Sequence, residues 1–337
     1  MKKIVGIIIP CYKASGLINS VISRIIKTTN KLSDLIELKI YLINDCCPQN
    51  CWKEVNSEFK INLINHAKNK GVGVASTTGF NAALKDNCSA IIKIDADMQH
   101  SPEYLLELIP FMTTLPKNQL YMIKGSRYHF QIKNNKVPFT RRIGSLLMEP
   151  IARVALNYRG LSDITNGYIA TNDMTLKYLL SKNIGKNFCD RYLFESSFLE
   201  KICTFQCEIY QFPIAAIYGK KWRSSMQSWK MALPISTFWL KAVSRRIYNN
   251  YLNNLNLGSF LLLIFAFTLI FVIYILNVNI IPYIKSGIFV SAGIAATFTS
   301  MLTISLICLL LFFFYDYTSS KKVKNINFKY FLKDIEI

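Results

Sequence analysis

Two long stretches near the end of this 337-residue chain carry no charged side chain. Residues 247–284 and 286–315 contain no Asp, Glu, Lys or Arg, and a single Lys separates them. A helix over residues 258–276 would have the length that crosses the hydrocarbon core of a bilayer. We therefore predict two transmembrane helices, at residues 258–276 and 287–315, with a short external loop at residues 277–286 between them.

The part of the chain before these stretches has ordinary globular composition and enough length to bury a core. The net charge of +20 would suit nucleic acid or an anionic membrane surface as a partner. Because two candidate spans follow, the membrane is the simpler partner, and we expect no nucleic-acid ligand. The N-terminus has only a short apolar run that ends at Pro10, which does not make a signal peptide. We therefore expect the N-terminal domain to stay in the cytoplasm.

Basic residues flank the two predicted spans. Arg245 and Arg246 precede the first span, and lysines follow the second span in the predicted tail at residues 316–337. The positive-inside rule then places both termini in the cytoplasm. Residues 227–257 are basic and contain interleaved Trp and Phe, which predicts helices on the surface of an anionic bilayer. Small residues in the second span would allow close packing within the hairpin or in a homo-oligomer.

Short apolar runs alternate with segments of helical periodicity over about the first hundred residues, a pattern that predicts a parallel α/β sheet covered on both faces. The predicted strands are residues 5–9, 38–43, 61–64 and 90–94, and the predicted helices are residues 17–29 and 79–84. Ligands of such sheets bind beyond the carboxyl ends of the strands. Polar residues and glycines would gather at that edge, from residues 10–12, Asp45, residues 69–73, Asp95 and Asp97.

The motif Asp95-Ala96-Asp97 directly follows the predicted strand at residues 90–94. In an extended chain, residues i and i+2 point to the same side. Two carboxylates that face one place repel each other unless a cation lies between them. Hard oxygen ligands with open positions suit Mg²⁺ or Mn²⁺, which takes substrate phosphates as its other ligands. The motif therefore predicts a metal and diphosphate site, and the alternative interpretation is a solvated turn.

The glycines of Gly71-Val72-Gly73 do not form a dinucleotide fingerprint. Ser76 occupies the sixth position of that motif, and the run does not follow the first strand. No Gly-Lys-Ser or Gly-Lys-Thr sequence follows, which excludes a P-loop. The two glycines fit a tight turn into a helix as well as they fit direct contact with a nucleotide.

Five motifs carry a resemblance to a known family. In chain order they are Ile7-Ile8-Ile9-Pro10-Cys11-Tyr12, Asn44-Asp45, Asn69-Lys70-Gly71-Val72-Gly73, Asp95-Ala96-Asp97-Met98-Gln99-His100 and Gly125-Ser126-Arg127-Tyr128. Together they resemble family-two glycosyltransferases of the GT-A fold, and the last two motifs are most similar to dolichyl- and polyprenyl-phosphate sugar transferases. The resemblance implies a GT-A (Rossmann-like) α/β domain with a mostly parallel sheet over residues 1–226.

The resemblance also implies a nucleotide-sugar donor and a divalent metal, Mg²⁺ or Mn²⁺. Asp95, Asp97 and Gln99 match the family's metal and diphosphate ligands. Asp45 matches the acidic residue that reads the nucleotide base, although Asn44 stands before it where the family often has Asp. The other residues implied in donor binding are Pro10, Tyr12, Lys70, Gly71, Ala96 and Arg223. Arg223 belongs to a basic loop that resembles the family's closing loop, and a membrane-facing patch is the alternative.

Three residues match acceptor-phosphate contacts in the dolichyl-phosphate mannose branch of the family: Arg127, Arg141 and Ser145. The planar guanidinium of Arg suits a phosphate because it can bind two oxygens at once. Arg141 and Ser145 lie in a predicted amphipathic helix at residues 141–156. As alternatives, Arg127 could pair with a carboxylate, and Arg141 could be membrane-surface charge.

Two further acidic residues match the family's pattern. Asp163 lies in a segment that resembles the family's Asp-x-Thr-Ser-Gly-Phe sequence, and Glu195 resembles the acidic position that follows it. Either carboxylate could orient a sugar hydroxyl, or could equally cap a helix or pair behind the site. The expected catalytic residues are thus Asp97, Arg127, Asp163 and Glu195.

The function implied is metal-dependent, inverting transfer of a hexose from a nucleotide-sugar to a polyprenyl phosphate. We expect it at the cytoplasmic face of a membrane, the inner membrane if the source is bacterial, in cell-surface polysaccharide assembly. One alternative is transfer to a hydroxyl of a lipid-linked glycan, which would need Glu195 or Asp163 as a general base. Another is a non-catalytic membrane scaffold with the same fold, which the intact pair of Asp95 and Asp97 argues against.

Overall fold

The computed structural model describes residues 2–129, 137–181, 191, 193–205, 207–215 and 228–328. The chain divides into two compact units, which are described separately here. The first unit comprises Met1–Trp239 and Lys322–Ile337, and the second comprises Leu240–Lys321. The chain therefore leaves the first unit, forms the second, and then returns to the first.

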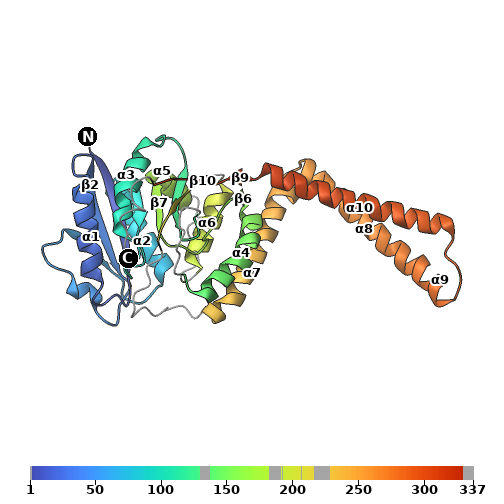
Figure 1. Cartoon of the computed structure of the whole chain (residues 1–337), viewed down its shortest axis with the longest axis horizontal. Coiled ribbons are helices and arrows are strands. Elements are labelled where there is room, and N and C mark those ends of the chain that lie inside the picture. Colours follow the sequence, from blue (N-terminus) through green and yellow to red (C-terminus); the bar gives the residue numbers. More distant parts are fainter. Residues whose placement is uncertain are drawn as a thin grey trace. The chain divides into compact units, whose positions relative to one another are not determined.

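An eight-stranded sheet forms the centre of the first unit, in the order β10-β8-β5-β7-β4-β1-β2-β3 (Figure 1). Its strands are β1 Lys3–Cys11, β2 Ile36–Asn44, β3 Ile61–Asn65, β4 Ala90–Lys93, β5 Tyr121–Ser126, β7 Ile169–Asn172, β8 Glu208–Pro213 and β10 Lys324–Asn325. Neighbouring strands are parallel except for β7, which runs antiparallel to β4 and β5. The prediction of a mostly parallel α/β sheet is confirmed.

Helices follow most of the strands. They are α1 Ile18–Asn30, α2 Val72–Lys85, α3 Leu105–Thr114, α4 Phe139–Leu156, α5 Asp173–Ser181, α6 Phe194–Thr204 and α7 Ser228–Ile247. The short elements are η1 Cys51–Glu54, η2 Pro102–Tyr104, β6 Tyr158–Arg159 and β9 Lys321–Lys322. Helix α2 packs closely because Gly79 has no side chain: a Cβ atom there would lie 2.3 Å from Cγ2 of Ile8. The glycine thus allows α2 to lie close to β1.

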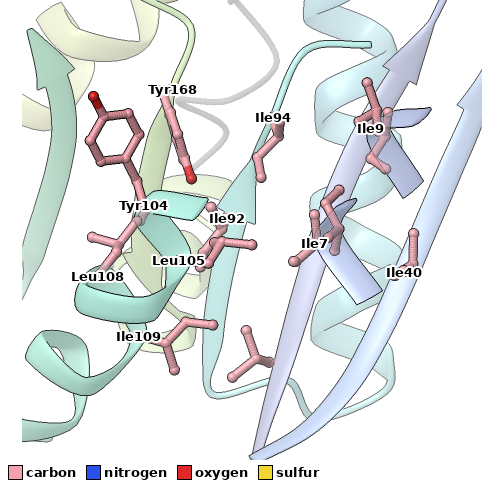
Figure 2. Close-up of a cluster of buried hydrophobic side chains, with 14 of the residues drawn as sticks. Ile7, Ile9, Ile40, Ile92, Ile94, Tyr104, Leu105, Leu108, Ile109 and Tyr168 are labelled. Atoms are coloured by element: carbon pink, nitrogen blue, oxygen red, sulfur yellow. The ribbon is translucent and has the colours of Figure 1, made fainter. Parts of the chain in front are cut away.

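The core of the first unit is made from apolar side chains of the central strands and of α1 and α3. The buried cluster includes Ile7 and Ile9 of β1, Ile92 of β4, and Leu105 and Leu108 of α3, and Ile92 lies next to Leu105 (Figure 2). These strands are buried on both faces, which explains their continuous apolar sequences. The long apolar runs that predicted strands therefore reflect burial in the middle of the sheet.

The carboxyl ends of the first four strands meet at one edge of the sheet. Cys11 at the end of β1 is paired with Asn44 at the end of β2, and Asn44 with Asn65 at the end of β3. Lys93 at the end of β4 is paired with Ile8. The backbone N–H of Asp45 donates to the carbonyl of Cys11 at 3.2 Å. This register gathers the polar motifs at one edge, as the sequence predicted.

The second unit contains two helices that are long and apolar enough to cross a membrane, by length and composition: Leu257–Lys285 and Ala292–Ser319. The first consists of α8 Leu257–Ile275, the π-helical turn η5 Leu276–Ile280 and α9 Ile281–Lys285, and the second is α10. The turn η4 Tyr248–Leu252 precedes them. Asn256 caps α8, because its side chain accepts from the N–H of Ser259 at 3.2 Å.

The predicted external loop at residues 277–286 differs from the structure, where the helix continues to Lys285. Pro282 lies within this continuous helix, directly after the π-helical turn η5. The helix ends only at Gly287, whose φ of 68° lies in the left-handed region that glycine adopts easily. The second helix begins after Ser291, whose hydroxyl accepts from the N–H of Ile294 at 3.4 Å. It therefore begins later than the predicted residue 287.

A buried ion pair joins the two ends of the hairpin within the second unit. Arg246, before the first helix, donates to both carboxylate oxygens of Asp316, near the end of the second, at 2.6 and 3.0 Å. The hydroxyl of Tyr251 also donates to Asp316, at 2.5 Å. The start of the first helix and the end of the second therefore lie side by side, which is the arrangement of a hairpin.

Candidate active site

The loop after β4 presents two aspartates to solvent. The Asp97 carboxylate accepts from the N–H of Gln99 at 3.1 Å, and Met98 has a φ of 64°, so the chain makes a tight turn there. The N–H of Asp95 donates to Nδ1 of His100 at 3.2 Å, which fixes the base of the turn. Asp97 is exposed, and the side chain of Asp95 is 31% exposed. Both carboxylates are thus accessible to a ligand.

A fully buried lysine lies beneath this loop. The Nζ atom of Lys93 is 2.6 Å from Oδ1 of Asp95, 3.2 Å from Oε1 of Glu195 and 3.3 Å from the carbonyl oxygen of Gly167. Burial opposes the charge of Lys93, but the two carboxylates outweigh it and raise the pKa of the amine. Lys93 therefore stays charged and orients Asp95 and Glu195 toward the same place.

The pKa values of the two aspartates move apart. Burial would raise the pKa of Asp95, but the charge of Lys93 lowers it. The pKa of Asp97 is raised, because partial removal from water and the negative charge of Asp95 both oppose its ionisation. A cation between the two carboxylates would remove this repulsion.

The donor set fits Mg²⁺ or Mn²⁺ that is completed by substrate. Among the described residues, no group of three or more His, Cys, Asp or Glu side chains could hold a metal. Asp95 and Asp97 alone supply two hard oxygen ligands, and Mg²⁺ typically takes one or two carboxylates together with substrate phosphates and water. Gln99, a further predicted ligand, is half-buried in the same turn.

Arg127 and Asp163 form a second buried pair. The guanidinium donates through Nε to Oδ2 at 2.8 Å and through Nη2 to Oδ1 at 2.6 Å, and the N–H of Arg127 donates to Oδ2 at 2.8 Å. Burial would raise the pKa of Asp163, but Arg127 lowers it to about 2. Glu149 of α4 accepts from the N–H of Asp163 at 2.9 Å, which fixes this loop to the helix.

This geometry changes the interpretation of Asp163. The sequence allowed it to orient a sugar hydroxyl, but its side chain is fully buried and accepts from Arg127 and Asn166. This arrangement corresponds to the alternative in which Asp163 forms a pair behind the site, here with Arg127. The pairing of Arg127 with a carboxylate, one of the two interpretations of that residue, is present. Lys124, which no motif in the sequence singles out, lies below this pair. Its amine donates to the carbonyl of Ser162 at 3.2 Å. Burial lowers the pKa of this amine to about 8.

Asp45 holds the glycine loop in place. Its Oδ1 accepts from the N–H of Lys70 at 2.9 Å, and its Oδ2 accepts from the N–H of Gly71 at 2.7 Å. Nδ1 of His66 lies 2.8 Å from Oδ1, and His66 reaches Thr78 of α2 through its other nitrogen at 3.0 Å. The carboxylate is buried, and its hydrogen bonds hold the loop at the start of α2. His66 was missed because a lone histidine carries no motif.

The family model described as "Glycosyl transferase family 2" matches residues 6–183. The chain belongs to glycosyl transferase family 2. The match begins within β1 and includes β2 to β4, the Asp95–Asp97 turn and the Arg127–Asp163 pair. The resemblance found in the sequence is therefore confirmed.

Two curated relatives illustrate the similarity of this glycosyltransferase. The chain is 32% identical over 173 residues to "Dolichol-phosphate mannosyltransferase" of Pyrococcus furiosus, a match that covers 49% of this chain and 45% of that protein. It is 25% identical over 202 residues to "UDP-N-acetylglucosamine--dolichyl-phosphate N-acetylglucosaminyltransferase" of Methanococcus voltae, covering 55% and 76%. The chain thus spans about half the length of the Pyrococcus relative.

Among solved structures, the glycosyltransferase resembles mannosyl-3-phosphoglycerate synthase from Rubrobacter xylanophilus. The TM-score is 0.51 at 13% sequence identity, over 76% of this chain and 77% of that protein. At this identity the similarity shows the fold alone. It agrees with a GT-A domain for the first unit.

The remaining predicted residues of the glycosyltransferase lie at the sheet edge, on α4 or outside the described residues. Pro10 is the penultimate residue of β1, and Tyr12, which is 43% exposed, follows that strand. Ser145 is half-buried on α4. Arg141 belongs to α4, but its side chain lies outside the described residues, and Arg223 does so entirely.

Proposed function

We propose that this glycosyltransferase transfers a hexose from a nucleotide-sugar to a polyprenyl phosphate, with Mg²⁺ or Mn²⁺ held by Asp95, Asp97 and the donor diphosphate. The observation that carries the proposal is the exposed Asp97 beside an Asp95 that Lys93 and Glu195 fix from below. Such a site provides oxygen ligands and a fixed charge pattern for a metal diphosphate.

The acceptor is proposed from the names of the relatives and from the two apolar helices. Besides the two dolichyl-phosphate enzymes, the chain is 26% identical over 155 residues to "Undecaprenyl-phosphate mannosyltransferase" of Micrococcus luteus, covering 44% of this chain and 61% of that protein. A polyprenyl phosphate lies in a membrane, and two helices of this chain have the length and composition to cross one. A lipid phosphate therefore fits both observations.

The chemistry needs little from a general base. An oxygen of the acceptor phosphate attacks the anomeric carbon from the face opposite the diphosphate, the bond to the diphosphate breaks, and the configuration inverts. The phosphate is already an anion near neutral pH, so catalysis consists of positioning and charge stabilisation. A bound Mg²⁺ or Mn²⁺, held by Asp95 and Asp97, would supply positive charge that stabilises the leaving diphosphate. Lys93 keeps Asp95 oriented, and Asp163 keeps the guanidinium of Arg127 in place for the acceptor phosphate.

Transfer to a hydroxyl remains the competing function, with Glu195 as the base. Burial raises the pKa of Glu195, which would suit a base. Its carboxylate, however, lies 3.2 Å from the Lys93 amine and serves as a charge partner there. We therefore favour the phosphate acceptor, with Arg141, Ser145 and Arg223 as further proposed contacts for acceptor and donor.

The function is tested by supplying purified protein in lipid with a panel of nucleotide-hexoses, polyprenyl phosphate and Mg²⁺ or Mn²⁺. We expect one donor to yield a lipid whose mass rises by one hexose residue, detected by mass spectrometry. Turnover of the donor with a glycan-lipid only would favour the hydroxyl acceptor. No turnover of any donor would favour a scaffold.

We also propose that both termini face the cytoplasm. Ile326 and Phe328, beyond the second apolar helix, pack in the core of the first unit, so the chain enters and leaves the hairpin from one domain. Reporter fusions at Met1 and Ile337 should therefore give the same, cytoplasmic, signal. A C-terminal reporter found outside would show that one of the two helices does not span.

A methyl group at Gly167 should disturb the site directly. A Cβ atom there would lie 2.6 Å from Oδ2 of Asp95 and 2.8 Å from Nζ of Lys93, too close for either. Since displacement of a catalytic group by about 1 Å can cost a hundredfold, Gly167→Ala should lower transfer by about that factor. The matched control is Gly293→Ala, because nothing lies within 4 Å of a Cβ at Gly293. Equal losses in both variants, measured as initial rates, would contradict this geometry.

A further inference from the structure

The segment that follows the second apolar helix joins the eight-stranded sheet of the first unit. Strand β10 pairs in parallel with β8, with Lys324 opposite Tyr210 and Asn325 opposite Gln211. The N–H of Ile326 donates to the carbonyl of Gln211 at 2.7 Å. Side chains on both sides of this short strand are buried, namely Val323, Ile326 and Phe328. The segment at residues 323–328 is thus held by main-chain bonds and by the core.

A polar route leads from this segment to the Arg127 loop. Gln211 donates to the side chain of Asn325 at 3.4 Å and accepts from the N–H of Ser162 at 2.7 Å. The hydroxyl of Ser162 lies 2.7 Å from that of Ser126. Ser126 and Ser162 directly precede Arg127 and Asp163 in the chain. The position of Gln211 therefore affects the positions of both Arg127 and Asp163.

An aromatic route leads from the same segment to the Asp95 loop. The ring of Phe328 lies 5.4 Å from that of Phe212, Phe212 lies 5.1 Å from Tyr168, and Tyr168 lies 5.2 Å from His100. Figure 2 shows Tyr168 in the core cluster, next to β4, the strand that leads into the Asp95 loop. His100 accepts from the N–H of Asp95. The four rings thus form a continuous packed path.

Phe328 also supports the start of the segment after β8. Its ring stacks on Tyr104 at 6.2 Å, and the hydroxyl of Tyr104 accepts from the N–H of Ala215 at 2.7 Å. Interiors are packed too tightly for one ring to move without its neighbours. Displacement of Phe328 would therefore be transmitted to β8 and to the site loops.

We propose that residues 323–328 are a positioning element of the active site, acting through Phe328 and Asn325. The segment holds Gln211 and Phe212 of β8, and these hold the loops of Arg127 and Asp95. The expected effect on sugar transfer rests on the proposed function, but the claim that this segment holds the loops of Arg127 and Asp95 in place does not. A chain cut before this segment would lose order at the site even if its donor-binding half folded.

The test compares Phe328→Ala with Asn327→Ala, whose side chain is exposed between two buried neighbours. Phe328→Ala should lower kcat for transfer by about tenfold, because small displacements of catalytic groups cost that much or more. Asn327→Ala should keep the wild-type kcat. Asn325→Ala, which breaks only the polar route, should raise the KM for the lipid acceptor more than that for the donor.

A second measurement reports the site without relying on turnover. The chain has three histidines, so ¹³C-labelled histidine gives a simple NMR spectrum in which His100 is assigned with His100→Gln. Phe328→Ala should shift the His100 signal through Tyr168, while His66 should keep its position. If Phe328→Ala does not fold, Phe328→Leu keeps an apolar side chain and should still shift His100. A folded variant with wild-type kcat and an unmoved His100 signal would overturn the proposal. Should the wild type make no glycolipid, the His100 shift still decides this inference separately.

Discussion

Asp97→Asn is expected to abolish the proposed sugar transfer and to leave the protein folded. The side chain of Asp97 is exposed, so the substitution disturbs no packing. It removes one of the two carboxylates that face the proposed metal, and loss of one preorganised charge-stabilising group costs about a hundredfold or more in kcat. We expect residual transfer near background at any concentration of Mg²⁺ or Mn²⁺, measured as glycolipid formed per minute.

The matched control for this variant is Asp34→Asn, since Asp34 is also an exposed aspartate, on the loop between α1 and β2. It should keep wild-type activity and the same metal dependence. Thermal unfolding should be unchanged in both variants. Full activity of Asp97→Asn, or full activity of the wild type in EDTA, would remove the metal from the mechanism.

Arg127→Ala should have the second largest effect, through the lipid acceptor. If Arg127 binds the acceptor phosphate, its loss leaves a desolvated anion without a charge-assisted partner, which typically costs about 2–5 kcal/mol. Since 1.4 kcal/mol is about a factor of ten, the acceptor requirement should rise, or turnover fall, at least tenfold. Donor affinity should change little, because in the proposed site the diphosphate is bound by the metal at Asp95 and Asp97 and not by Arg127.

The same variant also affects folding, because Asp163 is fully buried and would lose its charge partner. Breaking a buried pair from one side destabilises by about 3–5 kcal/mol. Two milder variants separate the effects. Arg127→Lys keeps the charge but not the two-pronged geometry and should rescue only in part. Asp163→Asn keeps Arg127 but loosens it, and should weaken acceptor use less than Arg127→Ala.

The hydroxyl-acceptor function makes the opposite prediction. There Glu195→Gln would be the most damaging change and Arg127→Ala would be mild. Donor binding by calorimetry and glycolipid formation, measured separately in each variant, distinguish the two functions. Weakened donor binding with a normal acceptor requirement in Arg127→Ala would place this residue on the donor, and the acceptor assignment would be wrong.

The central strands and the edge that carries the site could be predicted from sequence because each signal is local. The apolar runs of β2 and β4 are followed by the polar residues Asn44 and Asp95, and parallel pairing of β1 with both strands brings these ends together. The aspartates follow directly after such a run. Periodicity and spacing within a few residues were sufficient for these features.

The charge pairs behind the site could not be predicted, because their partners are distant in sequence. Lys93 and Glu195 are separated by 102 residues, and Arg127 and Asp163 by 36. The charged Lys93 inside an apolar run is the only local signal of the first pair. The sequence offered a carboxylate partner for Arg127 as one interpretation, but only the fold shows that this partner is Asp163.

The return of the chain to the sheet was also hidden. Strand β10 has only two residues, both polar, and its sequence is that of a basic tail. Its place is fixed by main-chain hydrogen bonds to β8 and by the burial of Phe328. Neither feature produces a periodic pattern in the sequence. Similarly, the end of the first apolar helix depends on Gly287 and not on hydrophobicity alone.

The most direct test of the proposed reaction follows the phosphorus of the acceptor. Protein in a bilayer is given the preferred nucleotide-hexose, Mg²⁺ or Mn²⁺ and polyprenyl phosphate, and ³¹P NMR is recorded during turnover. The phosphate monoester signal of the lipid should convert to a phosphodiester signal in step with release of the nucleoside diphosphate. Release of the nucleoside diphosphate while the lipid monoester signal stays unchanged would contradict transfer to the phosphate.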